Sequence, residues 1–246
     1  MSQPSGNVGM ATMSPGLVLA PVALLAFAGA MLAACSSPPP PAPTPLALAP
    51  SPTPALTSTP APTPTPAPRV VLADNFDDPS KGRLPSASGN LSQSLFGYVE
   101  GEYQIKPGAA VAIPGTYANI SVAFDARLVS GASESSVNIQ CRRLSAAESW
   151  YVVNVTPQLG AVAANRIDNG TGKNLVPRQA WPAIRQGAET NHIEVNCVGI
   201  TISARINGVE VLSVEDSTYN SGQVRLGATG VQATDVRIDN LVVTQH

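Results

Sequence analysis

Carboxyl groups are the first candidates for chemistry in this chain of 246 residues. Hydrolysis of a glycosidic bond usually needs two of them, about 5 to 10 Å apart, one as acid and the other as nucleophile or base. Glu210, Glu215 and Asp216 lie in VEVLSVED, but the two glutamates differ by five positions and would face opposite sides of a regular strand. Glu100 and Glu102 in VEGEY share a phase, yet the glycine between them is typical of a solvated turn. We therefore predict no catalytic pair of carboxylates.

Histidine and metal chemistry have little support in the sequence. The two histidines, His192 and the terminal His246, have no partner motif nearby, which argues against a histidine catalyst and against a zinc site. A group of aspartates could meet if the first and last strands pair: Asp74, Asp77, Asp78 and Asp239. Their oxygens would suit a structural Ca²⁺, but we favour the simpler interpretation that these aspartates cap turns at a strand end. We predict no other cofactor and leave the metal open.

Aromatic side chains are few, which makes each exposed one informative for sugar binding, because the C–H side of a pyranose packs on flat apolar faces. Trp150 and Tyr151 are adjacent in SWYVVNV, so in a strand one faces the core and the other faces outward. Trp181 lies in QAWPAIRQG, a loop that contains proline, and is the contact we favour most. Asn154 and Asn165 are candidate polar companions. Packing in the core or over a sheet is the alternative for each aromatic residue.

Cys35 lies between an uncharged apolar segment, residues 17 to 34, and a proline-rich segment. The sequence LAAC that it closes resembles the bacterial lipobox, in which a large aliphatic and two small residues precede a cysteine. This resemblance implies a lipoprotein signal peptide over residues 1–34, cleavage before Cys35 and a diacylglyceryl group on its sulfur. It also implies an extracytoplasmic protein anchored to a membrane, with Ser36 favouring the outer membrane or cell surface. An uncleaved single-pass anchor is the alternative, since no Lys or Arg precedes the apolar run.

Residues 35–68 form a proline-rich spacer. All 30 charged residues lie at or beyond Arg69, and 14 of the 24 prolines lie between Pro38 and Pro68. Such a segment cannot bury enough apolar surface to offset its ordering entropy, so we expect a disordered stalk. Residues 69–246 then form one folded domain. The net charge of −2 and the lack of a basic cluster argue against nucleic acid as a partner.

The elements that must position these residues have the two-residue period of strands. In NISVAFDARLVS, one face carries Ile120, Val122, Phe124, Ala126 and Leu128. SVNIQCR, HIEVNC, ITISARI, QVRLGA and DVRIDNLVV alternate in the same way, and Asn207-Gly208 suits a type I′ hairpin turn. Many short antiparallel strands predict an all-β sandwich.

Cys141 and Cys197 keep the inward phase of their strands, so both thiols should point into the core. Outside the cytoplasm such a pair would oxidise if adjacent. With Cys35 assigned to lipid, these two remain, and we predict a disulfide between them. Two separate buried thiols are the alternative.

Segments from LADNFDDPSKG through ISARINGVEVLSVEDSTYNSGQVRLGA to VRIDNLVV resemble, in this order, the concanavalin A-like, laminin-G-like jelly-roll domains of bacterial surface proteins. They are similar to the domain family labelled 3-keto-disaccharide hydrolase or family 16 glycoside hydrolase-like. The resemblance implies two packed antiparallel sheets with a concave side that commonly faces glycan. It implies no single activity, and the E-x-D-x-x-E strand motif of family 16 hydrolases is absent from this sequence.

These observations favour a membrane-tethered recognition domain without catalysis, which binds glycan or an envelope protein. A surface hydrolase or lyase acting on glycan is the alternative in the enzyme class. A purely structural envelope protein is the third hypothesis.

Overall fold

The computed structural model describes residues 67–86 and 95–246. The predictions for the signal peptide, for Cys35 and for nearly all of the spacer fall outside these residues. Within them, the regular structure is almost entirely β-strand, and the helical segments are three short 3₁₀ turns: Pro79–Lys81, Ser145–Ala147 and Pro157–Leu159. In this part of the chain, no helix has the length and apolar character needed to cross a membrane.

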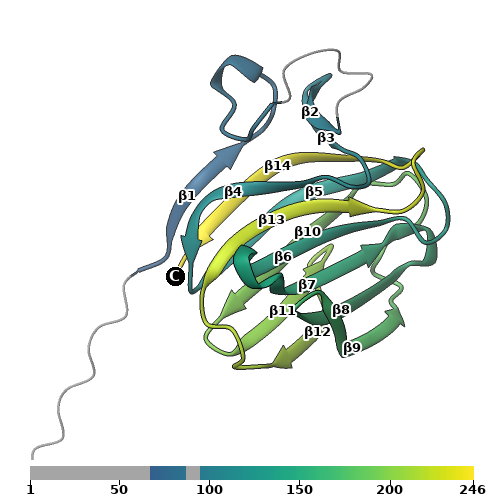
Figure 1. Ribbon diagram of the computed structural model, residues 1–246. Helices are drawn as coiled ribbons and strands as arrows, with labels where there is room; N and C mark the ends of the chain where they lie inside the picture. The colour runs from purple at the N-terminus through teal and green to yellow at the C-terminus, as the bar shows by residue number, and fades with distance from the viewer. Residues whose placement is uncertain (1–66, 87–94) are drawn as a thin grey trace, which may run out of the picture. The chain divides into compact units, whose positions relative to one another are not determined.

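Two antiparallel sheets pack face to face, as the alternation predicts (Figure 1). Sheet A has eight strands in the order β12 (Val209–Glu215), β11 (Thr201–Ile206), β10 (Asn191–Val198), β5 (Ile120–Ser130), β14 (Asp235–Gln245), β3 (Glu102–Ile105) and β2 (Phe96–Val99), with β1 (Arg69–Asp74) also paired to β14. Sheet B has six strands in the order β4 (Ala110–Tyr117), β13 (Gly222–Thr229), β6 (Ser136–Leu144), β7 (Ser149–Thr156), β8 (Ala161–Asp168) and β9 (Thr171–Ala180).

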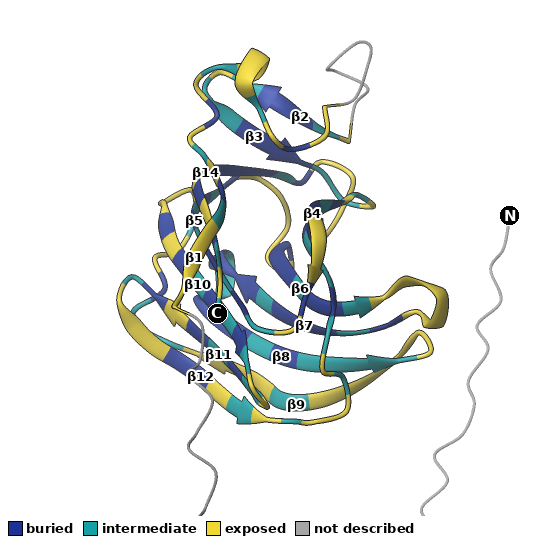
Figure 2. Cartoon of the chain, turned by 90° about the vertical axis from the view of Figure 1, so that its left-hand side faces the viewer, coloured by how far each residue is buried: buried dark blue, intermediate teal, exposed yellow. Residues whose placement is uncertain are grey.

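The core lies between the sheets and is filled by the inward phase of each strand. In β5 the predicted face is buried at every second position from Ile120 to Leu128. Figure 2 shows the buried positions along the central strands, whereas β9 and the hairpin turns are mostly exposed. Burial of these aliphatic side chains provides the main driving force for packing the two sheets together.

Local turn chemistry also agrees with the sequence. Asn207 and Gly208 have φ angles of 51° and 83° and connect β11 to β12. Glu100 and Gly101, with φ angles of 56° and 78°, connect β2 to β3 in the same manner. Positive φ at both central residues gives the turn a twist that matches that of the flanking strands. The first and last strands pair as expected, with Asp74 opposite Leu241.

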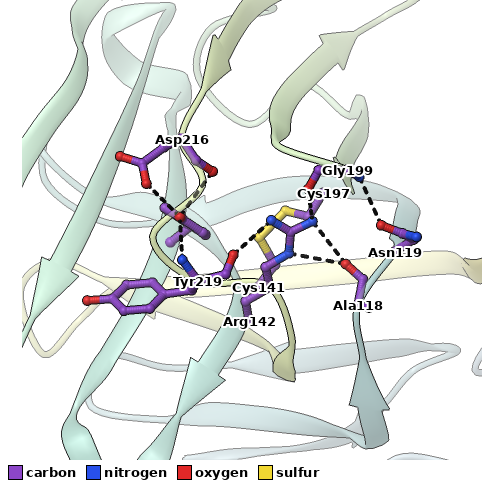
Figure 3. The surroundings of a disulfide bond; sticks show 9 residues. Ala118, Asn119, Cys141, Arg142, Cys197, Gly199, Asp216 and Tyr219 are labelled. Atoms are coloured by element: carbon purple, nitrogen blue, oxygen red, sulfur yellow. Dashed lines mark hydrogen bonds between the residues drawn. A yellow bond between two sulfur atoms is a disulfide. The ribbon is translucent and has the colours of Figure 1, made fainter.

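The predicted disulfide is confirmed. Cys141 on β6 and Cys197 on β10 are bonded, with Cα atoms 6.7 Å apart (Figure 3). Because β6 belongs to sheet B and β10 to sheet A, the bond joins the two sheets through the core. It closes a loop of 56 positions in the sequence.

A buried arginine beside the disulfide was not foreseen. Arg142 has a φ of 53° and only 1% exposure, so the bulge it forms turns its side chain away from the alternating pattern of β6. Its guanidinium donates to the carbonyl oxygen of Ala118 twice, at 3.1 and 2.9 Å, and to those of Tyr219 and Gly199 at 2.9 and 2.6 Å (Figure 3). Burial lowers the pKa of Arg142. The backbone carbonyls replace the water that this cation loses.

The prediction that Glu210 and Glu215 face opposite sides is wrong. The register pairs Glu210 with Arg205 and Glu215 with Thr201, and both partners lie in the outward phase of β11. An irregularity between these pairs lets Val211 and Leu212 both point inward, so a bulge resets the alternation of β12. The two glutamates share a face, but their partners are four residues apart, about 13 Å along the strand.

Candidate functional site

The outer face of sheet B, the side turned away from the core, carries a set of neutral polar side chains with a shared orientation. It is formed by the outward-pointing residues of β13, β6, β7 and β8, which alternate along each strand with the core residues. One row runs across the strands through Gly227, Asn138, Asn154 and Ala163, and the next through Arg225, Gln140, Val152 and Asn165. We call this surface the polar face. Amide side chains on it offer both donors and acceptors of hydrogen bonds.

A hollow of about 340 Å³ occupies one end of the polar face. It is lined by Glu134, Ser136, Asn154, Thr156, Ala163, Asn165, Asn174, Arg178 and Thr229. The two asparagines singled out from the sequence, Asn154 and Asn165, therefore lie in one hollow. Within the described lining, Glu134 is the sole carboxylate, and it is paired with Arg178 at 2.6 Å. The hollow thus presents hydroxyl and amide groups without a second carboxylate beside the first.

Trp150 lies at the other end of the polar face, opposite Ile167 of β8. It is half-buried, whereas its neighbour Tyr151 is 1% exposed, which confirms that one ring faces outward and the other inward. The guanidinium carbon of Arg143 lies 3.8 Å from the centroid of the Trp150 ring. A cation so close to an indole is held by the ring's electron density, so each side chain fixes the other.

Several polar groups continue from Trp150 toward the hollow. Arg143 donates to Gln140 at 3.3 Å, and Arg225 donates to Gln223 at 3.2 Å and to Ser145 at 3.4 Å. Burial and the nearby charge of Arg225 both lower the pKa of Arg143. Gly227 matters here because a Cβ at this position would lie 2.5 Å from the side-chain oxygen of Asn138. The glycine leaves room for that amide.

Trp181 is placed apart from Trp150, at the end of sheet B that holds the hollow, and it packs against the core. It follows Ala180, which pairs with Ala161, whereas Trp150 pairs with Ile167. These positions are six residues apart on β8, about 20 Å along the strand. Trp181 is half-buried against the core and borders a hollow of about 270 Å³ with residues of β9 and β12. Its position fits the alternative of packing over the sandwich edge, and the variants proposed in the Discussion test this alternative against ligand contact by Trp181.

The outer face of sheet A holds most of the charged network. Arg127 donates to both carboxylate oxygens of Glu102, at 2.7 and 2.6 Å, so this glutamate is an ion-paired strand residue and not the solvated turn acid that we predicted. His192 has a partner after all, because its Nδ1 lies 2.8 Å from a carboxylate oxygen of Asp125. The pairing arises because β10 lies beside β5 in register, which local sequence motifs cannot reveal.

Three of the four aspartates considered for calcium accept hydrogen bonds from backbone amides, and Asp77 accepts one from the side chain of Asn75. Asp74 accepts hydrogen bonds from the amides of Phe76 and Arg83, and Asp78 accepts one from the amide of Ser80. A hydrogen bond from the Ser80 side chain lowers the pKa of Asp78, and one from the Lys81 side chain lowers it by a smaller amount. Over residues 67–86 and 95–246, no group of three or more His, Cys, Asp or Glu side chains is arranged to hold a metal ion.

Sequence reasoning missed Asn138, Gln140, Arg143 and Arg225 of the polar face, and a local signal existed for all of them except Arg143. For these three, the signal was their alternation with the core residues Ile139 and Leu226, which places them on the outward phase. Arg143 could not be found in this way, because the bulge at Arg142 shifts the phase after Cys141.

Comparison with known proteins identifies the architecture. No protein-family model and no curated protein matches this sequence. Among solved structures, the carbohydrate-binding module CBM66 from Bacillus subtilis is 14% identical, with a TM-score of 0.50 over 73% of this chain and 95% of that chain. The Bacillus licheniformis β-glucanase is 10% identical, with a TM-score of 0.51 over 71% and 97%.

A protein of unknown function with a galectin-like fold from Bacillus subtilis is also 10% identical, with a TM-score of 0.53 over 72% of this chain and 96% of that chain. At such low identities the likeness concerns the fold alone. The described domain is a concanavalin A-like jelly-roll β-sandwich, as the sequence predicted.

Proposed function

We propose that this chain is a lipid-anchored extracytoplasmic protein whose jelly roll binds glycan on the polar face. The observation that carries the proposal is the arrangement of Asn154 and Asn165 in one hollow, on the same face as Gln140 and Trp150. Sugar hydroxyls both donate and accept hydrogen bonds, as do asparagine and glutamine amides. Solved structures described as a carbohydrate-binding module and as a β-glucanase share the fold and so support the proposal by analogy.

On the polar face and on β12, the positions of the carboxylates favour binding over hydrolysis. The hollow's Glu134 is engaged by Arg178, and Glu210 and Glu215 lie on sheet A, about 13 Å apart along the strand. Both arrangements differ from the pair about 5 to 10 Å apart that glycoside hydrolysis uses. The similarity of the sequence to the 3-keto-disaccharide hydrolase or family 16-like domains is therefore, in this proposal, a similarity of scaffold.

The proposal of a membrane tether is supported by the resemblance to a lipobox at Cys35 and by the proline-rich spacer. The Cys141–Cys197 disulfide supports an oxidising location, because disulfides persist mainly outside the cytoplasm. Mass spectrometry of the protein from bacterial membranes tests this part. We expect an amino terminus at Cys35 that carries a diacylglyceryl group, and an unmodified Cys35 inside an intact leader would contradict the lipid anchor.

Glycan binding is tested with the full chain on an array of bacterial and plant glycans. We expect a hit whose affinity falls when Asn154 and Asn165 are both changed to alanine. Asn196→Ala is the matched control, since Asn196 lies on the outer phase of sheet A and bonds to Glu194. Equal loss of binding in the control and in the double variant would contradict a site on the polar face. Product analysis after incubation with the hit tests the hydrolase alternative.

A further inference from the structure

Two arginines on the polar face have no carboxylate partner. Of the arginines in residues 67–86 and 95–246, four form ion pairs within 4 Å: Arg127, Arg166, Arg178 and Arg237. Arg143 and Arg225 form none, although both are half-buried. Their hydrogen bonds go to the neutral groups of Gln140, Gln223 and Ser145. Two cations are therefore partly removed from water without an ion-pair partner, and the charge of Glu148 acts on Arg143 only from beyond ion-pair distance.

These arginines are also close neighbours. Arg225 pairs with Gln140 and Gln223 pairs with Arg143, so the two arginines lie diagonally across β13 and β6. Diagonal positions on one face of an antiparallel pair are about 7 to 8 Å apart, within reach of long side chains. Like charges at this spacing repel each other, and an anion between them would turn that cost into an attraction.

Unsatisfied polar atoms mark the same place. In the described part of the chain, five buried side-chain nitrogen or oxygen atoms have no hydrogen-bond partner, and three of them belong to the polar face: Asn138 Oδ1, Arg143 Nε and Arg225 Nε. Buried polar atoms in folded proteins nearly always have a partner, so exceptions call for an explanation. Two of the three belong to guanidinium groups, whose other N–H donors match the oxygens of a carboxylate or sulfate.

From these observations we propose that the ligand of the polar face is an acidic glycan, whose carboxylate or sulfate groups are bound by Arg143 and Arg225. The inference rests on the proposed function and adds the chemical class of the ligand. Trp150 holds the guanidinium of Arg143 in place, and Asn154 and Asn165 in the hollow contact the neutral part of the same glycan. A guanidinium can donate two parallel hydrogen bonds to a carboxylate or sulfate group, which gives preference for the acidic sugar over a neutral one.

The experiment compares matched polymers that differ only in charge. Binding of the full chain is measured by titration calorimetry with sodium polygalacturonate and its carboxyl-reduced product, and with a sulfated galactan and its desulfated product. The two pairs separate carboxylate from sulfate as the source of the charge. We expect at least one acidic polymer to bind at least about tenfold more tightly than its neutral counterpart, because a hydrogen bond to a charged group is worth about that factor or more.

Variants assign the preference to the arginines. Arg143→Gln and Arg225→Gln should each reduce the preference for the acidic polymer, measured as the ratio of its affinity to that of the neutral polymer, by about tenfold. Arg205→Gln is the matched control, since Arg205 lies on sheet A and bonds only to the carbonyl of Gly208 in the described structure. Thermal unfolding of each variant checks the fold, and Arg225→Gln carries the test alone if Arg143→Gln is unstable.

The outcomes separate this inference from the proposed function. Equal binding of acidic and neutral polymers that still depends on Asn154 overturns the inference and leaves glycan binding intact. An acidic preference that survives both arginine variants also overturns it. Absence of binding to every glycan on the array overturns the proposed function itself. Single-stranded DNA that binds as tightly as the acidic polymer would show a general polyanion surface and overturn glycan recognition.

Discussion

The guanidinium of Arg143 rests 3.8 Å from the centre of the Trp150 ring, and both side chains come from strands that pair directly in sheet B. The contact joins the largest apolar surface of the polar face to one of its two unpaired cations. Each residue therefore limits the rotamers of the other, and a ligand meets a prearranged group instead of ordering two flexible side chains.

The two tryptophans should differ in their effect on binding. Trp150→Ala removes the ring and releases Arg143, so the affinity for a glycan found on the array should fall at least about tenfold. Trp181→Ala should leave that affinity within about twofold, because Trp181 packs against the core and borders β12 instead of the polar face. Titration calorimetry on both variants measures this. A loss with Trp181→Ala alone would move the site to the edge between β9 and β12.

Removal of the disulfide should destabilise the domain without changing its architecture. Closing a loop of 56 positions is worth about 4 kcal/mol in the chain-entropy model. The double variant Cys141→Ala and Cys197→Ala should therefore lose about that much free energy of unfolding, measured by urea denaturation. Reductant should destabilise the original protein and leave the variant unchanged. Equal sensitivity of both proteins to reductant would mean that the bond does not form in solution.

Arg142 should be among the most sensitive positions in the domain. Arg142→Met removes all four hydrogen bonds to the carbonyls of Ala118, Tyr219 and Gly199, which remain buried beside the disulfide. We expect a loss of about 3 kcal/mol or more, because each buried acceptor left without a donor costs about 1 to 3 kcal/mol. Arg205→Met, at an exposed arginine, should change stability by less than about 0.5 kcal/mol. Similar losses in both variants would contradict the role of the buried guanidinium.

Asp216 should contribute stability that depends on pH. Burial raises its pKa, but hydrogen bonds from Thr218, Tyr151 and Arg166 outweigh burial and lower the pKa to about 2. An aspartate with a depressed pKa stabilises the fold above its unfolded pKa of about 4 and loses this contribution as the pH falls toward 2. Asp216→Asn should therefore cost about 2 kcal/mol at pH 7, by the linkage of about 1.4 kcal/mol per pKa unit.

The difference between Asp216→Asn and the original protein should shrink as the pH falls from about 5 to about 2. Thermal unfolding at a series of pH values measures it. A difference that stays constant over this range would show that Asp216 acts through packing and not through its charge.

Some features of the site follow from local sequence and others do not. The outward phase of Asn154 and Asn165 is readable from the alternation of β7 and β8, since side chains in a strand point to opposite faces in turn. At two bulges the alternation of the sequence predicts the wrong face. At Val211 and Leu212 a bulge brings Glu210 and Glu215 to one face, and at Arg142 another sends a cation inward and Arg143 outward.

The sequence by itself determined the two-sheet architecture, the Asn207-Gly208 hairpin and the pairing of Cys141 with Cys197, because each depends on a short pattern of apolar alternation or on turn chemistry. Only the tertiary structure decided which polar residues share a surface. Asp125 meets His192, and Arg225 meets Gln140, through strand pairings between segments distant in the sequence. Such neighbours are fixed by sheet order and register, which arise when the whole core packs and which no local pattern encodes.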